Sequence, residues 1–282
     1  MIYVPDTEIE RFLLEDIAFG DVTSRSLKLE QQTGQITFFN RQASIVSGLR
    51  VVKRLFQKLD LDIIQSATDG QALSAEQILI QAQGNAAALH QAWKVAQNIL
   101  EWSCGVAQAS AELVNAARQM NPQIQIACTR KSIPGTRLLA TMAILDGGAI
   151  IHRAGTAETI LVFANHRRFL PQPLDWALHV RQLRQQAPEK KIVLEADNME
   201  EALAAMLAKP DIVQLDKFSP DEIRQCIAIA TTHGYTGSLI AAGGIHQANV
   251  KDYAATGVNV LVTSAPYYAK PADIRVVLSP LS

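Results

Sequence analysis

Six short apolar segments alternate with stretches of helical spacing beyond Asn121, and this alternation constrains the fold more than any other feature of the sequence. The predicted strands are Ile124–Ala127, Thr159–Phe163, Ile192–Leu194, Ile212–Leu215, Ser238–Ala241 and Val260–Val262. Strands that are separated by helices form parallel βα units. Two predicted helix starts carry capping residues, namely Asn198 with Glu201, and Ser219 with Pro220 and Glu222. We predict a closed or nearly closed α/β barrel, with an open doubly wound sheet as the alternative because periodicity does not separate the two.

Residues 1–120 follow a different pattern, which predicts a small α+β domain. Asp6 is predicted to cap a first helix that the GDVTS turn at Gly20 ends. Short β-rich runs at 36–39, 44–46, 62–64 and 78–80 then surround one amphipathic helix at 49–59. A long helical stretch follows, and Gly105 is predicted to break it near the domain boundary. We therefore expect an N-terminal domain of residues 1–108, a barrel domain of 109–268, and a tail of 269–282 that returns to the N-terminal domain.

The composition predicts a protein that folds without disulfide bonds. Hydrophobic residues make up 48% of the chain and charged residues 19%, far from the charge-rich signature of disorder. The sequence contains no run of about 18 apolar residues, so no membrane span is predicted. No secretory signal is visible at the start, and we therefore expect a cytoplasmic protein without membrane contact. Cys104, Cys128 and Cys226 are an odd number without CxxC spacing, which argues against disulfides and against a zinc site.

The net charge of −1 argues against nucleic-acid binding, but the charges are unevenly placed. Between Thr129 and Arg168 six Lys and Arg residues accompany two acidic residues, whereas between Glu189 and Glu222 nine acidic residues accompany four lysines. The first stretch suits an anion and the second a cation.

Basic residues follow two apolar segments of the predicted barrel, where the active site of such a fold lies. The segment TRKSIPGTR opens with Thr129, Arg130 and Lys131, and His152 with Arg153 follows residues 149–151. Arginine and lysine beside hydroxyl groups bind phosphate through charge-assisted hydrogen bonds. The alternatives are a solvated basic loop and a structural histidine, and the nearby His166-Arg167-Arg168 is also compatible with simple surface charges.

Acidic residues and a glycine turn follow the later strands. Glu195 and Asp216 are each the first acid after an apolar strand, and carboxylates there hold Mg²⁺ or sugar hydroxyls. The turn Ala242-Gly243-Gly244 offers backbone N–H groups to a phosphate at the following helix start. These features together predict a pocket for a phosphorylated sugar that bears a diphosphate. Because GxSxG, HExxH and a Walker lysine are absent, we expect charge stabilisation rather than covalent catalysis.

The motifs TRKSIPGTR, HRAGTAETILVFANH, LEADN, QLDKFSP and AAGGI, with LLEDIAFGDVTS near the start, resemble the quinolinate phosphoribosyltransferase family (nicotinate-nucleotide pyrophosphorylase). The resemblance runs in order over nearly the whole chain. It implies an N-terminal α/β sandwich, an incomplete α/β barrel of the type II phosphoribosyltransferase kind, a homodimer or higher homo-oligomer with a shared active site, and Mg²⁺-dependent use of phosphoribosyl pyrophosphate.

The resemblance also implies residue roles. It assigns catalysis to Lys131, Glu195 and Asp216, and the metal to the two acids. Residues expected to bind substrate are Lys94, Thr129, Arg130, Lys131, His152, Arg153, Phe163, Ala242, Gly243, Gly244 and Ser264. The implied reaction displaces pyrophosphate from the anomeric carbon of the ribose through an oxocarbenium-like state.

The sequence departs from the family pattern in the acceptor region. Phe163 and Ala164 stand where the family has a lysine that faces substrate and its acidic neighbour, so one positive charge is lost. Lys94 replaces an arginine, which keeps the charge but gives up the bidentate fork. Other replacements are Lys217 for asparagine, Ala242 for serine and Tyr268 for histidine. The pattern VFANHRRF resembles the ModD branch, paralogues associated with molybdate-transport genes.

The sequence is therefore compatible with three functions. The first is a phosphoribosyltransferase-like pyrophosphorylase whose acceptor is an N-heterocyclic acid other than quinolinate, with a link to molybdenum metabolism. The second is an ordinary quinolinate phosphoribosyltransferase, in which other cations replace the missing lysine. The third is a non-catalytic protein that uses the phosphate cradle to bind an oxyanion.

Overall fold

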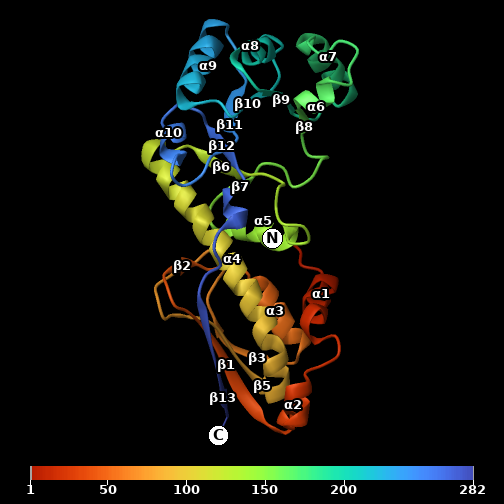
Figure 1. Cartoon of the computed structure of the whole chain (residues 1–282), viewed down its shortest axis with the longest axis vertical. Helices are drawn as coiled ribbons and strands as arrows, with labels where there is room; N and C mark the ends of the chain where they lie inside the picture. The colour runs from red at the N-terminus through yellow and green to blue at the C-terminus, as the bar shows by residue number, and fades with distance from the viewer. Residues whose placement is uncertain (1, 282) are drawn as a thin grey trace. The chain divides into compact units, whose positions relative to one another are not determined.

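The computed structural model describes residues 2–281, which divide into two compact units (Figure 1). The first unit comprises the chain up to Ala111, the segment Ser132–Gly148 and the segment from Pro266 onward. The second comprises Glu112–Lys131 and Ala149–Ala265. In the described range no helix is both long enough and apolar enough to cross a lipid bilayer.

The first unit is built on an antiparallel sheet with the strand order β13-β1-β5-β3. These strands are β1 (Thr33–Asn40), β3 (Asp62–Ser66), β5 (Ile78–Asn85) and β13 (Ile274–Pro280), and β2 (Ser44–Ile45) pairs separately with β4 (Ala72–Leu73). The helices are α1 (Asp6–Ile17), α2 (Val22–Ser26), α3 (Leu49–Lys58), α4 (Ala86–Met120) and α5 (Arg137–Asp146), with 3₁₀ turns η1 (Leu29–Gln31) and η2 (Ala265–Tyr268). The last residues of α4, from Glu112, are counted with the second unit. Because β13 pairs with β1, the last strand of the chain belongs to the first sheet.

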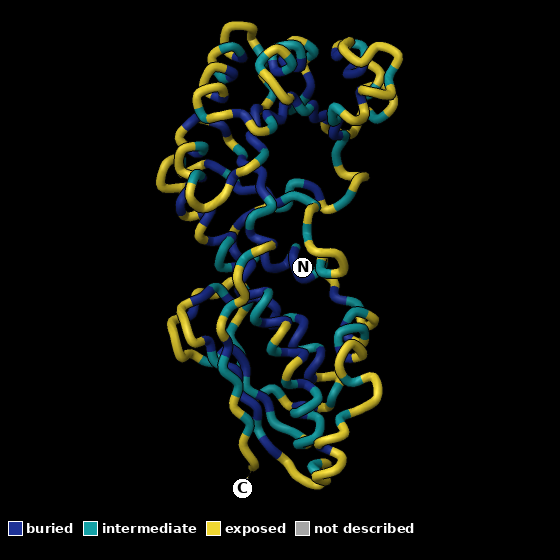
Figure 2. Tube along the Cα trace, viewed as in Figure 1, coloured by how far each residue is buried: buried dark blue, intermediate teal, exposed yellow. Residues whose placement is uncertain are grey.

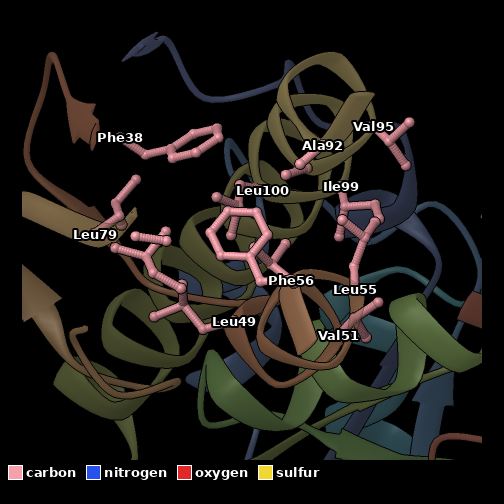
Figure 3. Packing of buried hydrophobic residues seen from close by; sticks show 14 of the residues in the cluster. Phe38, Leu49, Val51, Leu55, Phe56, Leu79, Ala92, Val95, Ile99 and Leu100 are labelled. Atoms are coloured by element: carbon pink, nitrogen blue, oxygen red, sulfur yellow. The ribbon is translucent and has the colours of Figure 1, made fainter. Parts of the chain in front are cut away.

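The core of this unit lies between the sheet and helices α3 and α4. Figure 3 shows Phe38 of β1 and Leu79 of β5 on one side, with Phe56 of α3 and Leu100 of α4 facing them. The rings of Phe38 and Phe56 lie 6.1 Å apart, centroid to centroid, at an angle of 41°. The apolar face that the spacing of α3 predicts is therefore the face that is buried.

At the first helix one local prediction is wrong and one is incomplete. Pro5 rather than Asp6 occupies the N-cap of α1, and no side chain caps that end. The turn at Gly20 does end α1, because the helix stops at Ile17 and the Gly20 N–H donates to the Ile17 carbonyl at 2.9 Å. The rest of GDVTS forms an unpredicted short helix, α2, where Asp21 accepts hydrogen bonds from the backbone N–H groups of Thr23 and Ser24.

Gly105 does not break the long helix, since α4 runs without interruption from Ala86 to Met120. A Cβ atom at Gly105 would lie 2.5 Å from the carbonyl oxygen of Lys270 and 3.1 Å from the Cα atom of Pro271. The glycine therefore serves a close approach of the C-terminal segment to the helix, which is a tertiary requirement.

The second unit is a seven-stranded sheet in which every recorded pairing is parallel, in the order β7-β6-β12-β11-β10-β9-β8. The strands are β6 (Gln125–Cys128), β7 (Ile150–Ile151), β8 (Ile160–Val162), β9 (Ile192–Ala196), β10 (Ile212–Asp216), β11 (Ser238–Ala242) and β12 (Val260–Thr263). The order is cyclic, because β6, the first strand of this unit along the chain, pairs with β12, the last. The ring is open between β7 and β8. This confirms the α/β fold with an incomplete barrel, since a doubly wound sheet would reverse its strand order.

All six predicted strands are present within two residues of their expected ends, and the two-residue strand β7 was not predicted. The helices are α6 (Ala164–Arg167), α7 (Trp176–Gln186), α8 (Met199–Leu207), α9 (Pro220–Thr232) and α10 (Val250–Ala254). Asn198 caps α8, and Ser219 with Glu222 forms a capping box at α9, as predicted. The strands of this unit are mostly buried, and exposed positions collect in loops and on the outer helix faces (Figure 2). The three cysteines are buried and free, as predicted.

Candidate active site

The carboxyl ends of the parallel strands surround a cavity of about 480 Å³ in the second unit. The predicted site residues that line it are Thr129, Arg130, Lys131, His152, Arg153, Phe163, Glu195, Asp216, Ala242, Gly243, Gly244 and Ser264. Lys94 lies on α4 in the first unit and is not among the lining residues. Its ammonium donates to Gln97 Oε1 at 3.1 Å and lies 4.4 Å from the centroid of the Trp93 ring.

One wall of the cavity is cationic. Arg153 follows β7 and is only 7% exposed, and its Nη1 donates to the carbonyl oxygen of Thr159 at 3.4 Å. Burial lowers the pKa of Arg153, and the neighbouring Arg130 guanidinium adds to that effect. Burial and the Arg153 charge lower the pKa of His152 from 6.5 to about 4, so this imidazole is neutral at pH 7. A bound anion would relieve the repulsion between the Arg130 and Arg153 guanidinium groups, which is why this wall suits phosphate.

A second wall of the same cavity is acidic. Glu195 and Asp216 lie near the ends of the neighbouring strands β9 and β10. Gln214 Nε2 donates to Glu195 Oε2 at 2.6 Å. Burial and the neighbouring Asp216 carboxylate together raise the pKa of Glu195 to about 7, although the hydrogen bond from Gln214 opposes the shift. Two carboxylates that repel each other across neighbouring strands suit a cation or the hydroxyl groups of a sugar.

The pair fits the implied Mg²⁺, because this ion binds one or two carboxylates and takes its other ligands from water and substrate phosphates. Lys217 Nζ lies 3.6 Å from Asp216 Oδ2 but is 81% exposed, so it can turn away from the carboxylate. Within residues 2–281 no group of three or more His, Cys, Asp or Glu side chains could hold a metal by itself. A metal here would therefore depend on oxygen atoms of the substrate.

A tight turn after β11 brings the glycines to the acidic wall. Gly243 has φ +89°, and a Cβ atom there would lie 2.6 Å from Lys217 Cγ and 2.8 Å from Asp216 Oδ1. Lys217 itself has φ +61°, and its N–H donates to the carbonyl of Ala242 at 2.7 Å. Gly244 has φ +71° with open space around it. The predicted helix start beside this turn is wrong, since α10 begins only at Val250.

Phe163 stands between this cavity and a larger one of about 1180 Å³ that runs along β8 and α7. Its ring stacks on the His166 imidazole, with centroids 5.5 Å apart and planes inclined by 21°. The backbone N–H of Phe163 donates to His166 Nδ1 at 3.0 Å, which fixes the turn into α6. An aromatic ring thus occupies the position where the family pattern has a charged side chain.

The interpretation of Arg167 as a surface charge is wrong, whereas Arg168 is exposed. Arg167 is 4% exposed, and its guanidinium lies 4.1 Å from the centroid of the Trp176 ring. Its Nη1 donates to the carbonyl of Glu195 at 2.8 Å, and its Nη2 pairs with Glu201 Oε2 at 2.9 Å.

The comparisons with known proteins agree with this geometry. Residues 106–277 match the description "Quinolinate phosphoribosyl transferase, C-terminal domain" and residues 21–104 the corresponding N-terminal domain. The chain belongs to the quinolinate phosphoribosyltransferase family. It is 51% identical to ModD of Escherichia coli O6:H1 over 280 residues and 47% identical to ModD of Pasteurella multocida over 278, with 99% of each chain covered.

The fold is also shared with family members of known structure. The nicotinate-nucleotide pyrophosphorylase from Francisella tularensis superposes with a TM-score of 0.88 at 27% identity, with 98% of both chains covered. This chain is therefore a phosphoribosyltransferase-type pyrophosphorylase, that is, a pentosyltransferase enzyme.

Sequence reasoning did not single out Gln214 or assign Arg167 to the site. A signal existed for the first, because Gln214 is a polar residue in the apolar segment Ile212–Leu215, where a buried parallel strand is expected to be apolar throughout. Arg167 carried no such signal, since it follows an exposed histidine and precedes another arginine.

Proposed function

We propose that this enzyme transfers the phosphoribosyl group of phosphoribosyl pyrophosphate to a ring nitrogen of an N-heterocyclic acid other than quinolinate. The observation that carries the proposal is that Arg153, Asp216 and Gly243 line one and the same cavity. A sugar with phosphate groups at both ends needs cations, carboxylates for its hydroxyls, and a turn without side chains.

The chemistry follows from the charges. The bond between the anomeric carbon and the pyrophosphate oxygen breaks through an oxocarbenium-like state, the ring nitrogen of the acceptor forms the new bond to that carbon, and pyrophosphate leaves with the electron pair. Arg130, Lys131 and Arg153 face the developing charge of the leaving pyrophosphate. Glu195 and Asp216 hold the ribose hydroxyls and favour the positive charge on the sugar. When bound, Mg²⁺ held by these two carboxylates would supply further neutralisation of the pyrophosphate.

Phe163 supports an acceptor with less negative charge than quinolinate. A second carboxylate of the acceptor would meet an aromatic ring instead of an ammonium group, and an unpaired buried carboxylate costs about 3–5 kcal/mol. The same ring, already stacked on His166, offers a face to a heterocycle. We therefore propose an acceptor with one carboxylate whose ring packs on Phe163.

The test is release of pyrophosphate from phosphoribosyl pyrophosphate and Mg²⁺ across a panel of N-heterocyclic acids with one or two carboxylates. We expect turnover with a mono-acid and little with quinolinate. Phe163→Lys should raise kcat/KM for quinolinate by at least roughly 150-fold, which corresponds to the smaller end of the cost above. Phe169→Lys is the matched control, because Phe169 is 90% exposed and lines neither cavity.

Two outcomes would overturn the proposal. Rapid quinolinate turnover that Phe163→Lys leaves unchanged would identify an ordinary quinolinate phosphoribosyltransferase. Silence across the whole panel, combined with tight binding of an oxyanion such as molybdate in calorimetry, would support a non-catalytic binding protein.

We also propose that the enzyme is a homodimer and that it is linked to molybdenum metabolism. The family assignment supports the dimer, and the identity to ModD proteins supports the link. Light scattering tests the first. Growth of a strain without the gene under molybdate limitation tests the second.

A further inference from the structure

We propose that Gln214 and Arg167 are positioning residues that hold Glu195 from two sides and set the direction of its carboxylate in the cavity. The role of Glu195 toward the sugar rests on the function proposed above. The positioning itself rests on contacts within the second unit.

Gln214 holds the carboxylate from the neighbouring strand. It lies directly opposite Glu195 in the parallel register of β10 and β9. Its side chain is 4% exposed, and its Nε2 donates to Glu195 Oε2 at 2.6 Å. Because Oε2 is engaged by Gln214, we assign Glu195 Oε1 to the ligand.

Stability does not explain the presence of this amide. Gln214 Oε1 is buried without a hydrogen-bond partner in the described part of the chain. An unsatisfied buried acceptor is destabilising, and a methionine of similar length would fill the same space without an unsatisfied oxygen. A buried amide whose oxygen is unsatisfied and whose nitrogen is bonded to a site carboxylate is best explained by the bond that it makes.

Arg167 holds the backbone of the same residue. Its Nη1 donates to the Glu195 carbonyl at 2.8 Å, and its Nη2 pairs with Glu201 at 2.9 Å. Trp176 lies against the guanidinium plane at 4.1 Å, and Glu201 Oε2 also accepts from the N–H of Asp197 at 3.1 Å. The planar fork therefore ties the end of β9 to the first turn of α8, which fixes where the Glu195 side chain starts.

Such a double anchor matters because a displacement of about 1 Å at a reacting group reduces rates by roughly 100-fold. A glutamate has several rotatable bonds, and a held backbone with a held carboxylate oxygen leaves one orientation. We therefore expect the loss of either contact to act on ligand binding and turnover more than on folding.

The experiment compares Gln214→Met with Gln225→Met, the same substitution at an exposed position of α9. Crystal structures of the wild type and of Gln214→Met report the carboxylate directly. Calorimetry with phosphoribosyl pyrophosphate and Mg²⁺ reports its consequence. We expect a rotated Glu195 carboxylate and binding at least tenfold weaker in Gln214→Met, with wild-type values for Gln225→Met.

A double-mutant cycle with Glu195→Gln separates positioning from a general structural effect. If Gln214 acts through Glu195, adding Gln214→Met to Glu195→Gln should weaken binding no further. Arg167→Lys keeps the charge opposite Glu201 but cannot also reach the Glu195 carbonyl, so we expect a partial loss. Arg181→Lys, at an exposed position of α7, is its control.

An unmoved Glu195 carboxylate in Gln214→Met, or losses that simply add in the cycle, would overturn the positioning role. A wild-type protein that does not bind phosphoribosyl pyrophosphate would overturn the proposed function instead. The crystallographic comparison would still decide the positioning role.

Discussion

Replacement of Gly243 by alanine tests how closely the glycine turn approaches the acidic wall. An added Cβ atom would lie 2.6 Å from Lys217 Cγ, 2.8 Å from Lys217 N and 2.8 Å from Asp216 Oδ1. One of these atoms belongs to the backbone, so the contact is not relieved by a side-chain rotation alone. The end of β10, which carries Asp216, must move by several tenths of an ångström.

Gly244 provides a control that differs in one respect. Both glycines have left-handed φ values, +89° and +71°, but a Cβ atom at Gly244 meets no atom within 4 Å. An alanine in this conformation costs about 1–2 kcal/mol, and the stiffer unfolded chain returns about 0.4–1 kcal/mol. We therefore expect Gly244→Ala to lower the free energy of unfolding by about 1 kcal/mol. Overpacking adds about 1–3 kcal/mol, so Gly243→Ala should cost about 2–4 kcal/mol.

Urea unfolding followed by circular dichroism measures both values. Calorimetry with phosphoribosyl pyrophosphate and Mg²⁺ should show a larger loss for Gly243→Ala, since only that variant displaces Asp216. Equal unfolding free energies for the two variants, within about 0.5 kcal/mol, would refute the reasoning, because they would show that the close approach has no energetic consequence.

Two further predictions concern stability. Arg50 pairs with Asp69 and Asp146, whose side chains are 6% and 9% exposed, so Arg50→Met should lower the free energy of unfolding by about 3–5 kcal/mol. Arg54→Met removes an exposed pair with Asp6 and should cost less than about 1 kcal/mol, and similar urea midpoints for the two variants would contradict this account. His152 has a pKa of about 4 when folded against 6.5 when free, so between these values the unfolded state binds the extra proton and stability falls as the pH falls. On acidification the free energy of unfolding should fall less in His152→Asn than in wild type, by up to about 3 kcal/mol. An equal effect of His233→Asn, at an exposed position, would argue against a local cause.

The site could be anticipated in outline because its signals are local. Arg130 and Lys131 come just after β6, and Glu195 and Asp216 lie at the ends of β9 and β10. Parallel strands bring their carboxyl ends to one edge. The same holds for the capped starts of α8 and α9, since a capping box is contained within four residues. The identification of the family rested on motifs of this kind, and the comparisons confirmed it.

Other features depend on partners that are distant in the sequence. Gly105 looked like a helix break, but its role comes from Lys270, 165 positions later. Gln214 meets Glu195 only through the register of β10 against β9, and Arg167 meets it only through the Glu195 backbone carbonyl. Both contacts join residues on different elements.

The amino-acid sequence by itself therefore determined the order of strands and helices, the family, and the kinds of side chain that meet at the barrel mouth, because periodicity, caps and strand ends are short-range properties. Only the tertiary structure decided that the ring opens between β7 and β8, that Arg167 is buried, and that Gly243 lies against Asp216. These depend on distances between residues that the chain brings together only when it folds.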